Sequence, residues 1–69
     1  MRRKYEGYIY SFTLADHGGR HIHVFRDNKP LGVYDRIDGA IRGLERNWNN
    51  RLQSGLEKFI DDLQAAAPP

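Results

Sequence analysis

The chain has 69 residues, no cysteine and a formal net charge of +2. This length fits one small domain with a thin hydrophobic core, and such domains often need a binding partner for stability. Without cysteine, the chain can form neither disulfides nor thiolate metal sites. There is neither an apolar run of about 20 residues for a membrane span nor a signal-like start, so we expect a cytoplasmic protein. Residues 1–36 hold seven Lys/Arg against four Asp/Glu. This excess fits an anionic partner such as nucleic acid, or an ordinary soluble surface.

The N-terminal segment predicts a basic arm followed by a strand. Residues 1–4 are expected to be a flexible arm, and residues 5–14 the first strand, because aromatic and β-branched residues alternate there. The apolar face of this strand carries Tyr8, Tyr10, Phe12 and Leu14. Such a face could stack RNA bases or form one wall of the core.

Two further strands are predicted on either side of a tight turn. Residues 21–27 and 31–35 read as strands, and residues 28–29 as a two-residue hairpin turn. This turn predicts that Val24 lies opposite Val33 and that His23 lies opposite Tyr34. The histidines would then lie on the sheet face away from the core.

The C-terminal half predicts a helix. Its apolar residues recur every three or four positions at Ile37, Ile41, Leu44, Trp48, Leu52, Leu56, Phe59, Ile60 and Leu63. Asp38-Gly39 could cap a helix from about Ala40, or Asn47 could cap a shorter one. Residues 65–69 are expected to form a disordered tail. The fold class is therefore α+β in a single domain over residues 1–69, with a three-stranded antiparallel meander and one long C-terminal helix packed on one face.

A cluster of histidines is the strongest functional signal. His17, His21 and His23 lie within seven residues, and His21 and His23 project from the same face of a strand. Imidazoles exchange protons near neutral pH, so these three could serve acid–base cleavage of RNA without a metal. The candidate phosphate contacts are Arg20, Gly18, Gly19, Arg26 and Lys29, because cations and exposed glycine amides both bind anions.

Two other interpretations of the cluster stay open. Three histidines with an open fourth position are typical of a zinc site, to which Asp16 could add a fourth or outer ligand. Alternatively, the histidines are hydrogen-bonded surface or interface groups with no chemical role.

The segment Asp16-His17-x-x-x-His21-x-His23-Val24 resembles the signature of the small bacterial proteins of domain-of-unknown-function family 4160. That motif runs Asp-His-x-Pro-Pro-His-Phe-His-Val after a first strand, and this chain has Gly19-Arg20 in place of the proline pair. The resemblance extends from about Tyr8 to Leu63. It implies a genetic context, since such proteins are often encoded beside a small partner in pairs that look like toxin–antitoxin modules.

The predicted topology is also similar to that of the HicA-type messenger-RNA interferases, which carry a Gly-Ser-His turn where this chain has Gly18-Gly19-Arg20-His21. That family begins with an additional helix, which this chain lacks. We therefore expect an RNA-directed protein of a toxin–antitoxin-type pair, the toxin and a candidate endoribonuclease, with RNA and a small cognate protein as partners. The alternatives are a non-catalytic binding module, such as an antitoxin or a homodimer, and a zinc-binding protein.

Overall fold

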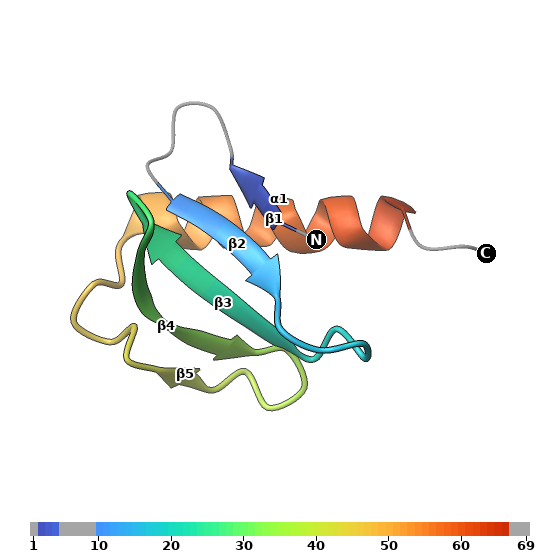
Figure 1. Ribbon diagram of the computed structural model, residues 1–69, viewed down its shortest axis with the longest axis horizontal. Coiled ribbons are helices and arrows are strands. Elements are labelled where there is room, and N and C mark those ends of the chain that lie inside the picture. Colours follow the sequence, from blue (N-terminus) through green and yellow to red (C-terminus); the bar gives the residue numbers. More distant parts are fainter. Residues whose placement is uncertain (1, 5–9, 67–69) are drawn as a thin grey trace.

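The computed structural model describes the backbone of residues 2–4 and the whole of residues 10–66. Its elements run in the order β1 (Arg2–Lys4), β2 (Tyr10–Leu14), β3 (His21–Arg26), β4 (Lys29–Asp35), β5 (Ile41–Arg42) and α1 (Asn50–Ala66). The strands form one antiparallel sheet in sequence order, and α1 runs across one side of it (Figure 1). The predicted α+β meander with a C-terminal helix is confirmed, with one short strand added at each edge.

The core lies between the sheet and α1, and the alternation of apolar residues builds it. Tyr10 and Phe12 of β2 and Ile22 and Val24 of β3 are buried, as successive side chains of a strand point to opposite faces. Phe12 stacks on Phe59 of α1 with ring centroids 5.5 Å apart. Within residues 10–66, Leu44, Leu52, Leu56 and Phe59 complete the set of buried apolar residues. The aromatic residues described on β2 therefore form a wall of the core rather than a surface for base stacking.

The β3–β4 hairpin differs from the predicted register. The turn residues are Asp27 and Asn28, one position earlier than the predicted 28–29, and β4 begins at Lys29 instead of residue 31. Both turn residues have a positive φ (50° and 68°), which is the geometry of a tight two-residue hairpin turn. The strands then slip by one residue, because Leu31 is an extra residue on β4 between the pairs Phe25–Pro30 and Val24–Gly32. Such a bulge leaves one residue unpaired and shifts the register beyond it.

The earlier turn moves the register by two residues and the bulge returns it by one, so the residues that lie opposite the histidines differ from those predicted. His23 lies opposite Val33, and His21 lies opposite Asp35. The predicted pairs of Val24 with Val33 and of His23 with Tyr34 are therefore wrong. Tyr34 instead lies opposite Ile22 and packs against the core, while the histidines keep the opposite face.

The helix begins later than either predicted start. Asn49 caps it, because its Oδ1 accepts the N–H of Leu52 at 2.8 Å. Asp38-Gly39 belongs to the β4–β5 connection, where Gly39 has a φ of 68° and donates its N–H to the Asp35 carbonyl. The apolar residues before Asn49 follow the helical period only by coincidence, and Ile37 at their start is 71% exposed.

Both ends of the chain also differ from expectation. Arg2–Lys4, predicted as a flexible arm, pairs with β2 as an edge strand. Ala65 and Ala66, predicted as part of the tail, belong to α1. Residues 5–9 of the predicted first strand, including Tyr8, and residues 67–69 lie outside the described residues. No helix in the described ranges has the length and apolar character that crossing a membrane requires.

Candidate functional site

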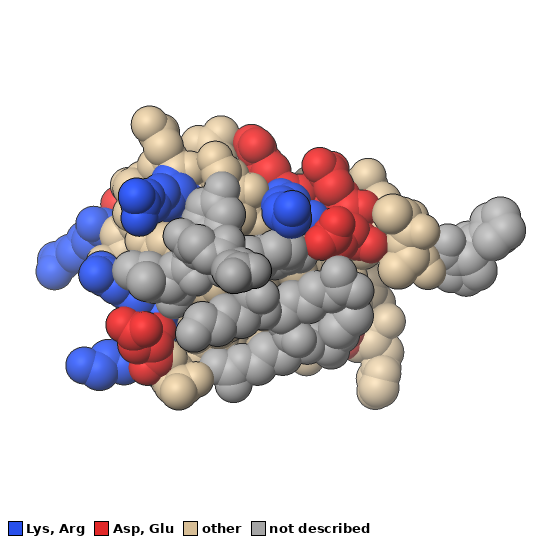
Figure 2. Space-filling view, turned by 90° about the horizontal axis from the view of Figure 1, so that it is seen from above, with Lys and Arg blue, Asp and Glu red and all other residues tan. Residues whose placement is uncertain are grey.

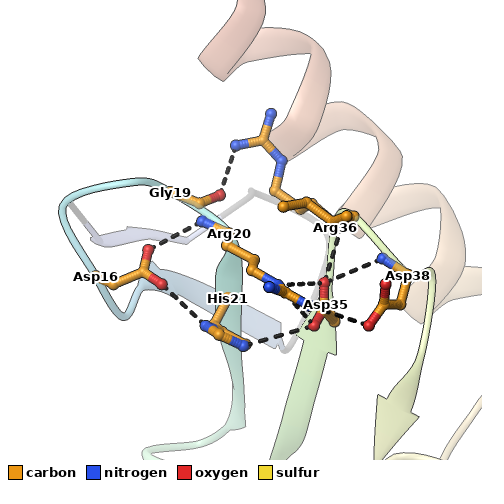
Figure 3. A network of polar contacts seen from close by, with 8 residues as sticks. Asp16, Gly19, Arg20, His21, Asp35, Arg36 and Asp38 are labelled. Carbon is orange, nitrogen blue, oxygen red and sulfur yellow. Dashed lines mark hydrogen bonds and ion pairs between the residues drawn. The ribbon is translucent and has the colours of Figure 1, made fainter.

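His21 stands at the start of β3 between two carboxylates from different segments. Its Nδ1 is 2.9 Å from Asp16 Oδ2 in the preceding loop, and its Nε2 is 3.6 Å from Asp35 Oδ2 at the end of β4. Figure 3 shows the imidazole lying between these two side chains. The antiparallel register produces this arrangement, because it places His21 and Asp35 opposite each other.

The loop before β3 is closed by its own backbone and by Asp16. The Asp16 Oδ1 accepts the backbone N–H of Arg20 at 2.9 Å, and Gly19 donates its N–H to the Asp16 carbonyl. Gly19 has a φ of 66°, a conformation that favours glycine. The carboxylate of Asp16 therefore holds the loop with one oxygen and His21 with the other.

Arg20 makes ion pairs within the chain instead of presenting a free cation. Its Nε lies 3.1 and 3.0 Å from the two carboxylate oxygens of Asp35, and its Nη2 lies 3.0 Å from Asp38 Oδ2. Asp35 is 15% exposed, and its Oδ1 also accepts the backbone N–H groups of Ile37 and Asp38. Arg20 thus ties the start of β3 to the β4–β5 connection (Figure 3).

These contacts keep both carboxylates charged. The hydrogen bond with the His21 ring is the largest effect and lowers the pKa of Asp16 below its usual value; burial opposes it, and the Arg20 N–H lowers the pKa further. Burial alone would raise the pKa of Asp35, but the N–H groups of Asp38 and Ile37 and the Arg20 guanidinium together lower it. Because ionised Asp16 can only accept a hydrogen bond, His21 Nδ1 must carry the proton they share.

A cavity of about 500 Å³ opens beside this network on the sheet face away from α1. Its lining residues are Ala15, Asp16, Arg20, His21, His23, Val33, Asp35, Asp38, Ala40 and Arg42. His23 is exposed, and its ring centroid lies 6.5 Å from that of Phe25 on the same strand. His21 and His23, two residues apart on β3, therefore share one open cavity.

The other predicted site residues lie elsewhere. His17 is exposed on the loop and does not line the cavity. Gly18 and Gly19 line a neighbouring groove of about 410 Å³ beside α1. Arg26 and Lys29 line a third depression at the β3–β4 turn. Figure 2 shows most of the Lys and Arg visible in that view toward one end of the molecule, with one acidic group among them, and a cluster of Asp and Glu right of the centre with one basic group beside it.

The three histidines do not converge as a metal centre would require. Among residues 10–66, which include every histidine, no group of three His, Asp or Glu side chains is arranged to hold a metal ion. His21 directs Nδ1 at Asp16, and His17 lies outside the cavity that holds the other two histidines. The described residues therefore do not form the zinc site of His17, His21 and His23 that the sequence left open as an alternative.

Sequence reasoning missed Asp35, Asp38 and Arg42, all of which line the cavity. The signal for Asp35 was its place at the end of the strand that pairs with β3. The turn assumed at residues 28–29 hid that signal, because it placed Asp35 opposite Ile22 instead of His21. Arg42 had no signal of its own, since the apolar period around it predicts a helix.

Comparison with protein-family models, with curated proteins and with solved structures finds no match to this chain.

Proposed function

We propose that this chain is an RNA-directed protein, a metal-independent endoribonuclease whose proton transfers are made by His21 and His23. The observation that carries the proposal is the Asp16–His21 pair, which opens on the same cavity as His23. A carboxylate that holds one imidazole nitrogen fixes the ring and its tautomer, and leaves the other nitrogen for proton transfer. In His21 that other nitrogen is Nε2, which faces Asp35 Oδ2 at 3.6 Å, beyond hydrogen-bond distance.

The two histidines are spaced for cleavage of a phosphodiester. Residues two apart on a strand are about 6.7 Å apart along it, so two imidazoles can stand on either side of one phosphate. One imidazole takes the proton of the ribose 2′-hydroxyl as that oxygen bonds to phosphorus. The other protonates the 5′-oxygen as its bond to phosphorus breaks. The products are a 2′,3′-cyclic phosphate and a free 5′-hydroxyl.

The resemblance to family 4160 and to the HicA-type interferases supports a cellular setting for this activity. In that setting the chain is the cytoplasmic toxin of a toxin–antitoxin-type pair, and a small cognate protein binds and silences it. Arg20 takes no phosphate in this scheme, because Asp35 and Asp38 already hold its guanidinium.

The test is cleavage of labelled RNA by the purified protein in the presence of EDTA. His21→Ala and His23→Ala should each lower the cleavage rate by about 10²–10⁴-fold, the usual contribution of general acid–base catalysis. His17→Ala is the matched control and should cleave as the wild type does, since His17 lies outside the cavity.

The same variants should be expressed in cells, where the wild type and His17→Ala should arrest growth. A wild type that neither cleaves RNA nor arrests growth would contradict the proposal, as would activity that survives both cavity substitutions. RNA binding without cleavage would instead favour the non-catalytic binding module.

A further inference from the structure

An anion that binds in the cavity would need a positively charged side chain to contact it. Two of the nearby arginines already make contacts within the chain. Arg20 is paired with Asp35 and Asp38. Arg36 donates from Nη1 to the Gly19 carbonyl at 2.8 Å and lines the neighbouring groove rather than the cavity. Neither arginine can contact a bound anion fully without giving up contacts that hold the loop.

Arg42 differs from both of these arginines. It lines the cavity from β5 and is exposed, and its side chain forms no hydrogen bond or ion pair with another residue in the part of the chain that the structure describes. On the sheet it lies opposite Val33, which in turn lies opposite His23. These three residues form one row across the open face.

The row has the dimensions of a phosphate site. Neighbouring strands are about 4.8 Å apart, so the backbones of His23 and Arg42 are about 10 Å apart, with the small apolar Val33 between them. Side chains that stand up from the two ends of such a row can both contact one anion held above its centre. A guanidinium binds phosphate through two parallel N–H donors.

The backbone of Arg42 is held in place by close packing. A Cβ atom added at Gly32 of β4 would lie 2.2 Å from the Arg42 carbonyl oxygen, and one added at Gly43 would lie 2.9 Å from the Leu31 carbonyl oxygen. Gly43 also has a φ of 80°. The two glycines therefore let β5 lie against β4, and the Arg42 side chain starts from a fixed point.

The distribution of charge around the cavity also favours binding of an anion beside Arg42 on β5. Asp16, Asp35 and Asp38 stand on the side of the β2–β3 loop, where His21 and Arg20 pair with them. The three carboxylates already have partners on that side, so the unpaired guanidinium on β5 supplies the positive charge that attracts a phosphate to the His23 end of the cavity, two residues along β3 from His21.

We propose that Arg42 and His23 form a phosphate-binding site above Val33, and that this site holds the phosphate of the RNA substrate. The second half of this inference rests on the proposed function. The first half concerns phosphate chemistry alone and can be tested without RNA cleavage.

The experiment has two arms, each read by NMR on the intact chain. The first arm titrates inorganic phosphate and follows the His23 ring and the Arg42 Nε–H. The second arm titrates a 2′-O-methyl RNA oligonucleotide, which cannot be cleaved through its 2′-oxygen. With both ligands, the NMR signals of these two groups should shift at lower ligand concentration than the other signals of the chain. Arg42→Gln should raise the dissociation constant of each ligand by about tenfold, as expected for one lost charge-assisted contact.

The controls separate Arg42 from charge in general. Arg46→Gln removes an exposed arginine that does not line the cavity and should bind as the wild type does, while Arg42→Lys should recover part of the affinity. In the RNA arm, Arg42→Gln should also lower the dependence of log affinity on log salt by about one unit, the sign of one lost phosphate contact.

The outcomes distinguish the two proposals. Phosphate that binds at Arg42 without any RNA binding would support the phosphate site and overturn the RNA-directed function. Unchanged phosphate affinity in Arg42→Gln, or shifts centred on Arg20 instead, would overturn the phosphate site.

Discussion

At the scale of single residues, Asp16 and Asp35 determine how the histidine strand is held. Asp16 joins the loop to His21, and Asp35 joins β4 to Arg20 and to its own turn. The residue types of the site were visible in the sequence around His21, but the roles were not. Arg20 looks like a phosphate contact in the sequence and is an internal ion-pair partner in the structure, because a guanidinium pairs with whatever carboxylates the fold brings within reach.

The two carboxylates predict how stability depends on pH. Both have a pKa below 3.8 in the folded chain, whereas in the unfolded chain they return to about 3.9. Between these values the unfolded chain binds more protons, so stability rises with pH there. The contribution of these groups is therefore fully present above about pH 5 and is lost progressively as the pH falls through the unfolded value and then through the lowered folded values.

Urea denaturation at a series of pH values from about 2.5 to about 6 measures this dependence. The double variant Asp16→Asn, Asp35→Asn should lose less stability below about pH 4 than the wild type does. Asp27→Asn is the matched control, because Asp27 lies exposed in the β3–β4 turn. An identical pH slope in the wild type and the double variant would contradict the roles assigned to these carboxylates.

At the scale of elements, the packing of β5 on β4 brings Arg42 to the cavity. This contact depends on Gly32, where a Cβ atom would meet the Arg42 carbonyl oxygen at 2.2 Å and backbone atoms of Gly43 and Leu44 within 3 Å. The segment of residues 42–44 cannot move away from Gly32 without displacing Leu44, which is fully buried. The sequence predicted a helix over this segment because Ile41 and Leu44 share the helical spacing with residues that do form α1.

Gly32→Ala should therefore be strongly destabilising. Overpacking against fixed backbone costs about 1–3 kcal/mol, and chemical denaturation should show a loss of that order. Gly18→Ala is the control, because a Cβ atom at Gly18 meets nothing within 4 Å and its φ is not positive. Equal stabilities of the two variants would mean that β5 does not lie against β4 as described.

At the scale of the whole molecule, the fold depends on one small core between the sheet and α1. Phe12 and Phe59 are fully buried and stacked at its centre. A domain of this size buries only about 60% of the surface that its unfolded chain exposes. The burial of a single aromatic ring therefore contributes a large part of its free energy of unfolding.

Phe59→Ala should remove about 3–5 kcal/mol, as do other truncations of buried aromatic residues. The variant should then be largely unfolded at room temperature, as judged by circular dichroism and by its melting temperature. Ile37→Ser is the control and should have little effect, although Ile37 belongs to the same apolar period in the sequence, because it is 71% exposed. A large loss of stability in Ile37→Ser would contradict the exposed position of this side chain.

The sequence by itself determined which residues of β2, β3 and α1 face the core, and hence that His21 and His23 lie on the opposite face of the sheet. These features follow from the local periods of strands and helices, which need no knowledge of distant residues. Only the tertiary structure decided that His21 lies between Asp16 and Asp35, that Arg20 is engaged, and that Arg42 reaches the cavity. The position of the β3–β4 turn, a one-residue bulge and a two-residue edge strand set those contacts, and none of them changes the local apolar pattern from which the elements are predicted.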